Sequence, residues 1–77
     1  MFNWFAERDD VKKRIAELEG RIASLRDKLR RVAEGTVESN TTQRILVIRE
    51  QELERTRFYA QFIDDRIAEL TAKMRRR

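Results

Sequence analysis

Two residue types that carry chemistry are missing from this chain of 77 residues, which has no cysteine and no histidine. Without cysteine the chain has no disulfide, no thiol nucleophile and no thiolate metal site. Without histidine it lacks the commonest general base and a common zinc ligand. The carboxylates that remain alternate with basic residues, a pattern typical of a solvated, salt-bridged helix face. We therefore expect a non-enzymatic protein that binds no cofactor and no metal.

Helix-breaking residues are also scarce, since the chain has no proline and only two glycines, while 42% of its residues are charged. This composition is typical of long solvated helices and coiled coils. No apolar run approaches the roughly 18 residues that a membrane span needs. The apolar start of the chain is too short for a secretory signal. We expect a soluble, cytoplasmic protein.

The first half of the chain has an apolar heptad repeat that predicts a helix over about residues 3–34. The steps between apolar residues alternate between four and three, which is the pattern of a coiled-coil seam. The seam consists of Trp4, Val11, Ile15, Leu18, Ile22, Leu25, Leu29 and Val32. Gly35 is placed to end this helix, with Val37 folding back onto Val32.

The second half predicts another helix, over about residues 40–75, after a turn at residues 35–40. The turn is rich in Gly, Ser, Thr and Asn, and Asn40 with Gln43 resembles a capping box. The second seam consists of Leu46, Arg49, Leu53, Thr56, Ala60, Ile63, Ile67, Leu70 and Met74. Because two of these residues are polar, an alternative stays open in which the buried face of the second helix is rotated to a neighbouring set of residues, here called the drifted seam. Its core residues would be Ile45, Ile48, Tyr59 and Phe62.

A short connection makes the two helices antiparallel neighbours, so the expected fold is all-α, an antiparallel two-helix coiled-coil hairpin over residues 1–77. A register that places Val32 opposite Leu46 and Val11 opposite Ile67 brings opposite charges together along both flanks. The first flank has Lys12–Asp64, Glu19–Arg57 and Arg26–Glu50; the second has Glu7–Lys73, Lys28–Glu52 and Arg21–Tyr59, with Arg14–Arg66 repulsive. Exposed pairs contribute about 0.2–1 kcal/mol each, so they select a register more than they stabilise it. The alternative is a pair of continuous long helices from two chains.

A hairpin this small buries little surface, and such domains usually need a staple or a partner. Apolar residues remain outside the seam, and contiguous exposed aromatic residues normally mark an interface. The predicted protein interface consists of Val47, Ile48, Phe58, Tyr59 and Phe62. Phe2 and Phe5 are expected to join it at the open end of the hairpin. The expected partners are a second copy, giving a four-helix bundle, or a larger protein.

The sequence therefore predicts a protein–protein interaction module, acting as an assembly, adaptor or regulatory subunit of a larger complex, a role common among phage and mobile-element proteins. The alternative is a dimeric, basic helical hairpin that binds RNA or DNA. Basic residues recur every seven positions along the first helix, and a basic stripe of this kind can follow a phosphate backbone. The candidate contacts are Arg14, Arg21, Lys28 and Arg31. A membrane-surface role is disfavoured, because Trp4 falls on the seam.

Overall fold

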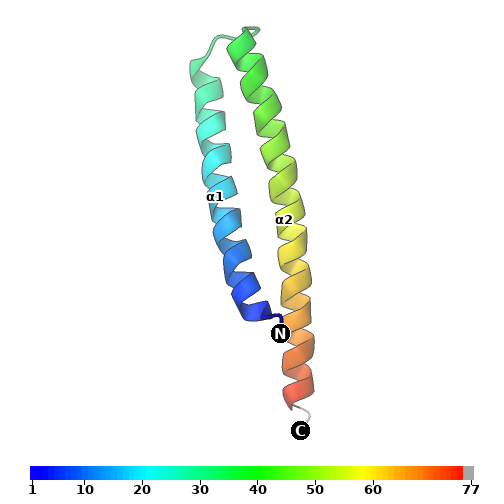
Figure 1. Cartoon of the computed structure of the whole chain (residues 1–77). Helices are drawn as coiled ribbons and strands as arrows, with labels where there is room; N and C mark the ends of the chain where they lie inside the picture. Colours follow the sequence, from blue (N-terminus) through cyan, green and yellow to red (C-terminus); the bar gives the residue numbers. More distant parts are fainter. Residues whose placement is uncertain (76–77) are drawn as a thin grey trace.

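The computed structural model describes residues 1–75, which form two antiparallel helices (Figure 1). Helix α1 spans Trp4–Arg31 and helix α2 spans Val37–Arg75. Together they make a rod of 63 × 20 × 14 Å. Arg76 and Arg77 lie outside the described residues. The predicted all-α helical hairpin is confirmed.

Side-chain caps set the first residue of each helix. The Asn3 side chain accepts hydrogen bonds from the backbone N–H groups of Phe5 and Ala6, at 3.0 and 3.2 Å, as an N-cap residue does. At the start of α2 the backbone N–H of Ser39 donates to Thr36 Oγ1, at 3.1 Å. Asn40 lies inside α2, so the predicted capping box was wrong. Thr36 caps the helix instead.

The connection between the helices is formed by residues 32–36, because α1 ends at Arg31 rather than near residue 34 and α2 begins at Val37 rather than near residue 40. Gly35 lies in this turn with a φ of 77°, a left-handed conformation that glycine adopts without a steric penalty. The sequence predicted that Gly35 would directly follow the last residue of α1. This was wrong, because α1 ends at Arg31 and residues 32–34 lie between it and Gly35. Val37 is 82% exposed, so its expected packing against Val32 was also wrong.

The hairpin core lies along the two predicted seams and forms two clusters. The buried apolar residues are Val11, Leu18, Ile22, Leu53, Ile63 and Ile67. Val11, Ile63 and Ile67 form the cluster nearer the open end, and Leu18, Ile22 and Leu53 form the cluster nearer the turn. The drifted seam is wrong, since its members Ile48 and Phe62 are 55% and 46% exposed.

Polar seam residues satisfy their hydrogen bonds within α2. Thr42 and Thr56 are buried, and each hydroxyl donates to the carbonyl four residues earlier in the helix, at 2.8 and 2.7 Å. This back-bonding removes most of the cost of burying a hydroxyl. Arg49 is half-buried and extends its guanidinium out of the seam to Glu52. Polar residues therefore fit the seam without moving it.

The register differs from the predicted one by one heptad. Leu18 packs with Leu53, whereas the sequence had placed Leu25 there. Glu7 contacts Tyr59 and Lys28 pairs with Glu38, so their predicted partners on the second flank were wrong. The first flank is confirmed at Glu19–Arg57 and Arg26–Glu50. A slip of one heptad keeps both stripes facing each other and still brings those two flank pairs within reach, so they could not separate the two registers.

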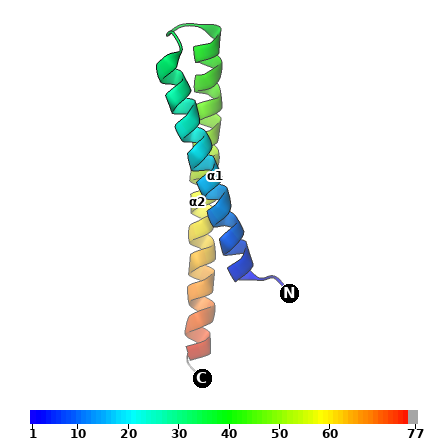
Figure 2. The ribbon, with the colours of Figure 1, turned by 90° about the vertical axis from the view of Figure 1, so that its left-hand side faces the viewer.

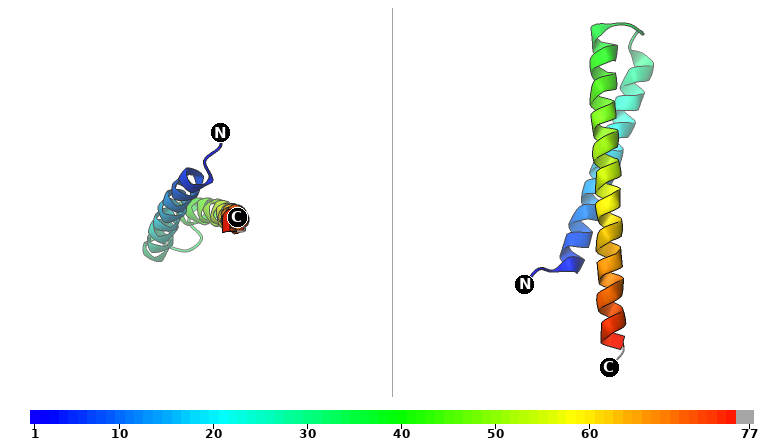
Figure 3. Two further views of the ribbon diagram at one scale, coloured as in Figure 1. Left: turned by 90° about the horizontal axis from the view of Figure 1, so that it is seen from below. Right: turned by 90° about the vertical axis from the view of Figure 1, so that its right-hand side faces the viewer.

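This register leaves the end of α2 projecting beyond α1 (Figure 1). Trp4, predicted to face Met74, packs instead against the cluster of Val11, Ile63 and Ile67, and Met74 is 76% exposed. The helices cross at a shallow angle, so that the first turns of α1 swing to one side of α2 (Figures 2 and 3). No helix within residues 1–75 is long and apolar enough to cross a membrane.

Candidate functional site

All five residues of the predicted protein interface are exposed on α2. Their exposed fractions are 52% for Val47, 55% for Ile48, 81% for Phe58, 39% for Tyr59 and 46% for Phe62. Phe58 lies on the side of α2 opposite the hairpin seam. Tyr59 and Phe62 are three residues apart, so they share a helix face, and that face lies beside α1. The structure therefore spreads the predicted set over a broad sector of α2 rather than one narrow stripe.

Tyr59 and Phe62 belong to an aromatic cluster that includes the N-terminal residues. The Tyr59 and Phe62 rings stack at 6.2 Å between centroids. Trp4 meets Phe62 edge-to-face at 5.9 Å and meets Phe2 at 4.6 Å. The guanidinium of Arg66 lies over the rings of Trp4 and Phe62, at 5.9 and 5.8 Å. Edge-to-face pairs and cations over aromatic rings are favourable geometries, so the cluster links the first turn of α1, through Trp4, to α2.

Two members of this cluster, Trp4 and Arg66, were not predicted to belong to the interface. Trp4 had been assigned to the seam alone, yet it is half-buried and contacts both the core and Phe62. Once the register moves by one heptad, Trp4 comes level with residues near Ile67. The signal in the sequence was that Tyr59 and Arg66 are seven residues apart and so share one face of the second helix. In the predicted register that face had no aromatic residue of the first helix beside it.

Phe5 does not join this cluster, contrary to the expectation. It lies on the other flank of the hairpin, where it lines a shallow groove of about 500 Å³ together with Leu70 and Met74. The guanidinium of Arg8 lies 5.5 Å from the centre of the Phe5 ring. The open end of the hairpin therefore has two separate apolar patches. The patch around Phe2 and Trp4 adjoins the predicted interface, and the patch around Phe5 does not.

A second heptad stripe runs along α2 beside the hairpin seam, and we call it the outer stripe. It consists of Ile45, Ile48, Glu52, Arg55, Tyr59 and Phe62, with steps alternating between three and four. The four apolar members are between 39% and 55% exposed. Apolar residues thus occupy both ends of the outer stripe, and one acidic and one basic residue occupy its middle. Such a stripe has the spacing of a helix-packing surface.

Glu52 connects the outer stripe to α1. Its carboxylate accepts hydrogen bonds from Arg14 at 2.6 Å and from Arg49 at 3.0 Å. The hydrogen bond from Arg49 has the largest effect on the pKa of Glu52 and lowers it below the usual 4.5. The charges of Arg14 and Arg49 act in the same direction, and partial burial opposes them. At Tyr59, partial burial raises the pKa of the phenol, and so does the carboxylate of Glu7, which accepts its hydrogen bond at 3.2 Å.

The lowered pKa of Glu52 predicts a pH-dependent contribution to hairpin stability. Because the folded state favours the carboxylate, the contribution is present above pH 4.5 and is lost as the pH falls through the lower, folded-state pKa. Glu52→Gln should lower the melting temperature near neutral pH, and the difference from the wild type should shrink in acid. Circular dichroism melts of both proteins over this range measure it.

The matched control for this experiment is Glu54→Gln, since Glu54 is exposed on the same helix and forms no ion pair within residues 1–75. Its melting temperature should stay close to that of the wild type at every pH. A Glu52→Gln difference that stays constant into acid would contradict the assignment of this stabilisation to the ionised carboxylate.

Three of the four candidate nucleic-acid contacts are engaged by acidic side chains. Arg14 pairs with Glu52, Lys28 with Glu38 at 3.5 Å, and Arg31 with Asp27 in its own helix. Within residues 1–75 only Arg21 of this set forms no ion pair. Partnered basic residues have less charge to offer a phosphate backbone. The predicted basic stripe therefore has charges of both signs in the structure, because carboxylates lie beside its basic residues.

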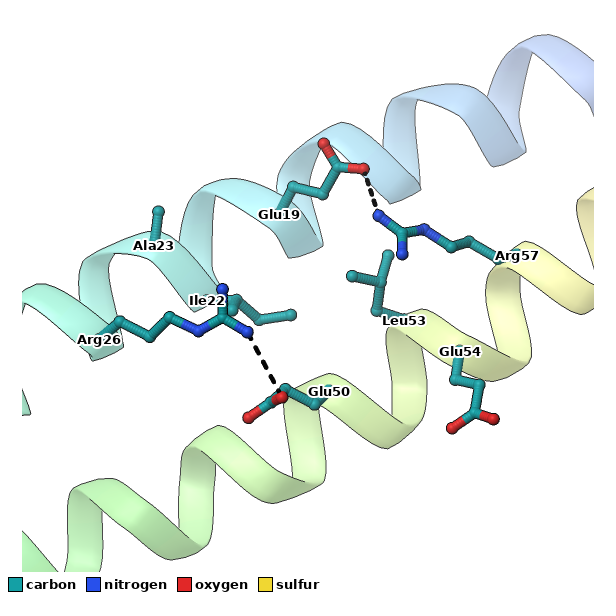
Figure 4. Close-up of a pocket in the computed structure, with 8 residues that line it drawn as sticks. All are labelled: Glu19, Ile22, Ala23, Arg26, Glu50, Leu53, Glu54 and Arg57. Atoms are coloured by element: carbon teal, nitrogen blue, oxygen red, sulfur yellow. Dashed lines mark hydrogen bonds and ion pairs between the residues drawn. The ribbon is translucent and has the colours of Figure 1, made fainter.

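The opposite flank of the hairpin has a groove of about 480 Å³, shown in Figure 4. The Arg57–Glu19 pair at 3.0 Å and the Arg26–Glu50 pair at 3.5 Å bridge it from helix to helix. Ile22 and Leu53 of the core lie between these bridges. No cluster of three or more acidic side chains suited to a metal ion occurs among residues 1–75. On this flank, salt bridges therefore join the two helices of the hairpin.

Comparisons with protein-family models, with curated proteins and with solved structures gave no match to this chain.

Proposed function

We propose that this chain is a non-enzymatic protein–protein interaction module, a small cytoplasmic assembly, adaptor or regulatory subunit. The observation that carries the proposal is the exposed apolar sector of α2, which continues through Tyr59 and Phe62 into the aromatic cluster. Exposed apolar patches of this kind are typical of protein interfaces, and aromatic residues and arginine are enriched at interface centres. In this sector Arg66 already lies over two of the rings.

The limited core of the hairpin supports the same proposal. Among residues 1–75 only six apolar side chains are buried, and of these Ile63 alone is completely inaccessible. A chain of this size, without disulfide or metal, gains much of its stability from partners. Binding through α2 would cover the apolar residues that folding leaves in water.

The RNA- or DNA-binding alternative is the weaker proposal, because Arg14, Lys28 and Arg31 are already paired with carboxylates. It predicts binding that weakens steeply with added salt and with substitution of Arg21, which forms no ion pair in the part of the chain that the structure describes. The interaction-module proposal predicts no such dependence.

Affinity capture tests the proposed function. The tagged chain is incubated with extract of the cells that encode it and, separately, with its own untagged copy. Phe58→Ala with Phe62→Ala should reduce capture of at least one of these partners by tenfold or more, corresponding to about 1.4 kcal/mol or more of binding free energy. The matched control is Phe5→Ala with Met74→Ala, which removes equally exposed apolar side chains from the other flank.

Circular dichroism should show that both double variants keep their helix content. If the wild type and the Phe58→Ala, Phe62→Ala variant capture neither partner, or capture both equally, the proposed function is wrong.

A further inference from the structure

We infer that the outer stripe of α2 is the contact surface for a second copy of this chain, with the two α2 helices packed antiparallel about a two-fold axis. This inference deepens the proposed function and depends on it, since it names the partner. Its basis is the order of residues along the stripe, which is self-complementary when read in opposite directions.

The pairing follows from the heptad spacing. If Glu52 of one chain lies opposite Arg55 of the other, the same symmetry places Arg55 opposite Glu52. Moving outward from this centre, Ile48 then meets Tyr59 and Ile45 meets Phe62. Every apolar residue of the outer stripe faces an apolar residue, and the two charged residues face their opposites. A closed two-fold contact of this kind requires such self-complementarity.

Neighbouring registers fail the same test. A shift of one heptad in one direction puts Ile45 opposite Arg55 and Ile48 opposite Glu52. A shift in the other direction puts Ile48 opposite Arg66, and Ile45 opposite Glu69. Both shifts bury apolar side chains against charges, which is costly. The central Glu52–Arg55 pair therefore selects a single register, as polar seam residues do in coiled coils.

Charges beside the outer stripe agree with the same register. Arg44 and Asp65 lie on the outer edge of α2, where the two-fold places each opposite the other. Arg44 and Arg55 form no ion pair within residues 1–75, so both are available to a partner. Glu52 accepts hydrogen bonds from Arg14 and Arg49, and a carboxylate has acceptor capacity for a further donor.

The arrangement also accounts for the charges on α1. The outer stripe lies about a quarter turn around α2 from the hairpin seam, so the pairing sets four helices at the corners of a bundle. The two α1 helices then run antiparallel on the same side of the bundle. The facing side of α1 has three acidic residues and one basic residue in its first half, and only basic charges in its second half. The acidic residues are Glu7, Asp10 and Glu17; Arg14 is the basic residue of the first half, and it already pairs with Glu52, while Arg21, Lys28 and Arg31 are the basic residues of the second.

Cysteine crosslinking tests both the partner and the register, because the natural chain has no cysteine. Ile48→Cys and Tyr59→Cys are made as separate single variants. Mixed under oxidising conditions, they should form a disulfide-linked dimer, since each thiol lies opposite the other across the two-fold. Each variant alone should crosslink weakly, because its two copies lie about 16 Å apart along the helix axis at 1.5 Å per residue. Ile48→Cys mixed with Arg66→Cys is the control for a shift of one heptad.

The mass of the unmodified chain supplies the second measurement. Light scattering should give twice the 9.3 kDa of one chain, and Ile48→Asp with Phe62→Asp should reduce it to one chain. The crosslinking variants keep the inference testable if that double variant unfolds.

The outcomes separate this inference from the proposed function. A monomer that still captures a cellular protein through Phe58 and Phe62 would overturn the second-copy inference and leave the proposed function standing. Equal crosslinking in the mixed and single-variant reactions, or preferred crosslinking in the control mixture, would overturn the antiparallel register. Preferred crosslinking of Ile48→Cys to Tyr59→Cys, with a dimeric mass, supports the inference in full.

Discussion

Replacing Ile63 with alanine should lower the free energy of unfolding by about 2–5 kcal/mol, the range for large-to-small changes in a packed core. Ile63 is 0% exposed and packs with Val11 and Ile67. Small domains have about 3–5 kcal/mol of stability from a single core, so much of the variant should be unfolded at room temperature. Urea titration followed by circular dichroism measures the loss.

Met74→Ala is the matched comparison for this prediction, since Met74 is 76% exposed. Exposed substitutions usually change stability by no more than about 0.5 kcal/mol. If Ile63→Ala and Met74→Ala unfold at the same urea concentration, Ile63 does not belong to a buried core with Val11, and the prediction is wrong.

A disulfide across the core should form between Leu18→Cys and Leu53→Cys and should stabilise the hairpin strongly. Both residues are buried in the cluster nearer the turn. Closing a loop of roughly 35 residues removes about 4 kcal/mol of entropy from the unfolded chain in the standard loop model. The oxidised double variant should therefore melt well above its reduced form, and non-reducing electrophoresis should show the bond within one chain.

The same measurement on Leu25→Cys with Leu53→Cys distinguishes the registers. Those residues face each other in the register that the sequence alone suggested, and they lie about 10 Å apart along the axis in the structure, at 1.5 Å per residue. Disulfide geometry does not span that distance without moving the backbone. Faster or more complete oxidation of this pair than of the Leu18→Cys, Leu53→Cys pair would show that the hairpin is offset by one heptad.

The sequence was sufficient for the helices, the seams and the antiparallel connection, because apolar spacing determines which face of each helix is buried. It was insufficient for the register. A heptad pattern repeats every seven residues, so two offsets bury the same stripes. The residues that separate them, Ser39 and Thr42, are polar and were not counted in the seam. Both are buried, and the Thr42 hydroxyl bonds to its own helix, a local interaction that apolar spacing does not report.

The candidate interface was predicted as a set of exposed residues, and their exposure is confirmed at every position. Its composition changed because register decides which distant residues come together. Trp4 reaches Phe62 only in the observed register, and Phe5 lies on the other flank near Leu70. Helix periodicity does not determine the side that the Phe2 ring takes, since residues 1–3 precede α1.

The uneven distribution of apolar residues along the seam has a consequence for how the hairpin folds. The positions nearest the turn are occupied by Ser39 and Thr42, whereas Val11 and Ile63 lie near the open end. Zippering outward from the loop would gain little apolar burial in its first steps. The buried apolar contacts nearest the turn join Ile22 and Leu18 to Leu53, segments 31–35 residues apart. Closing that loop carries a larger entropy cost than pairing at the turn and slows folding relative to hairpins stabilised at their turn. Amide hydrogens beside the turn should accordingly exchange with solvent sooner than those near Ile63.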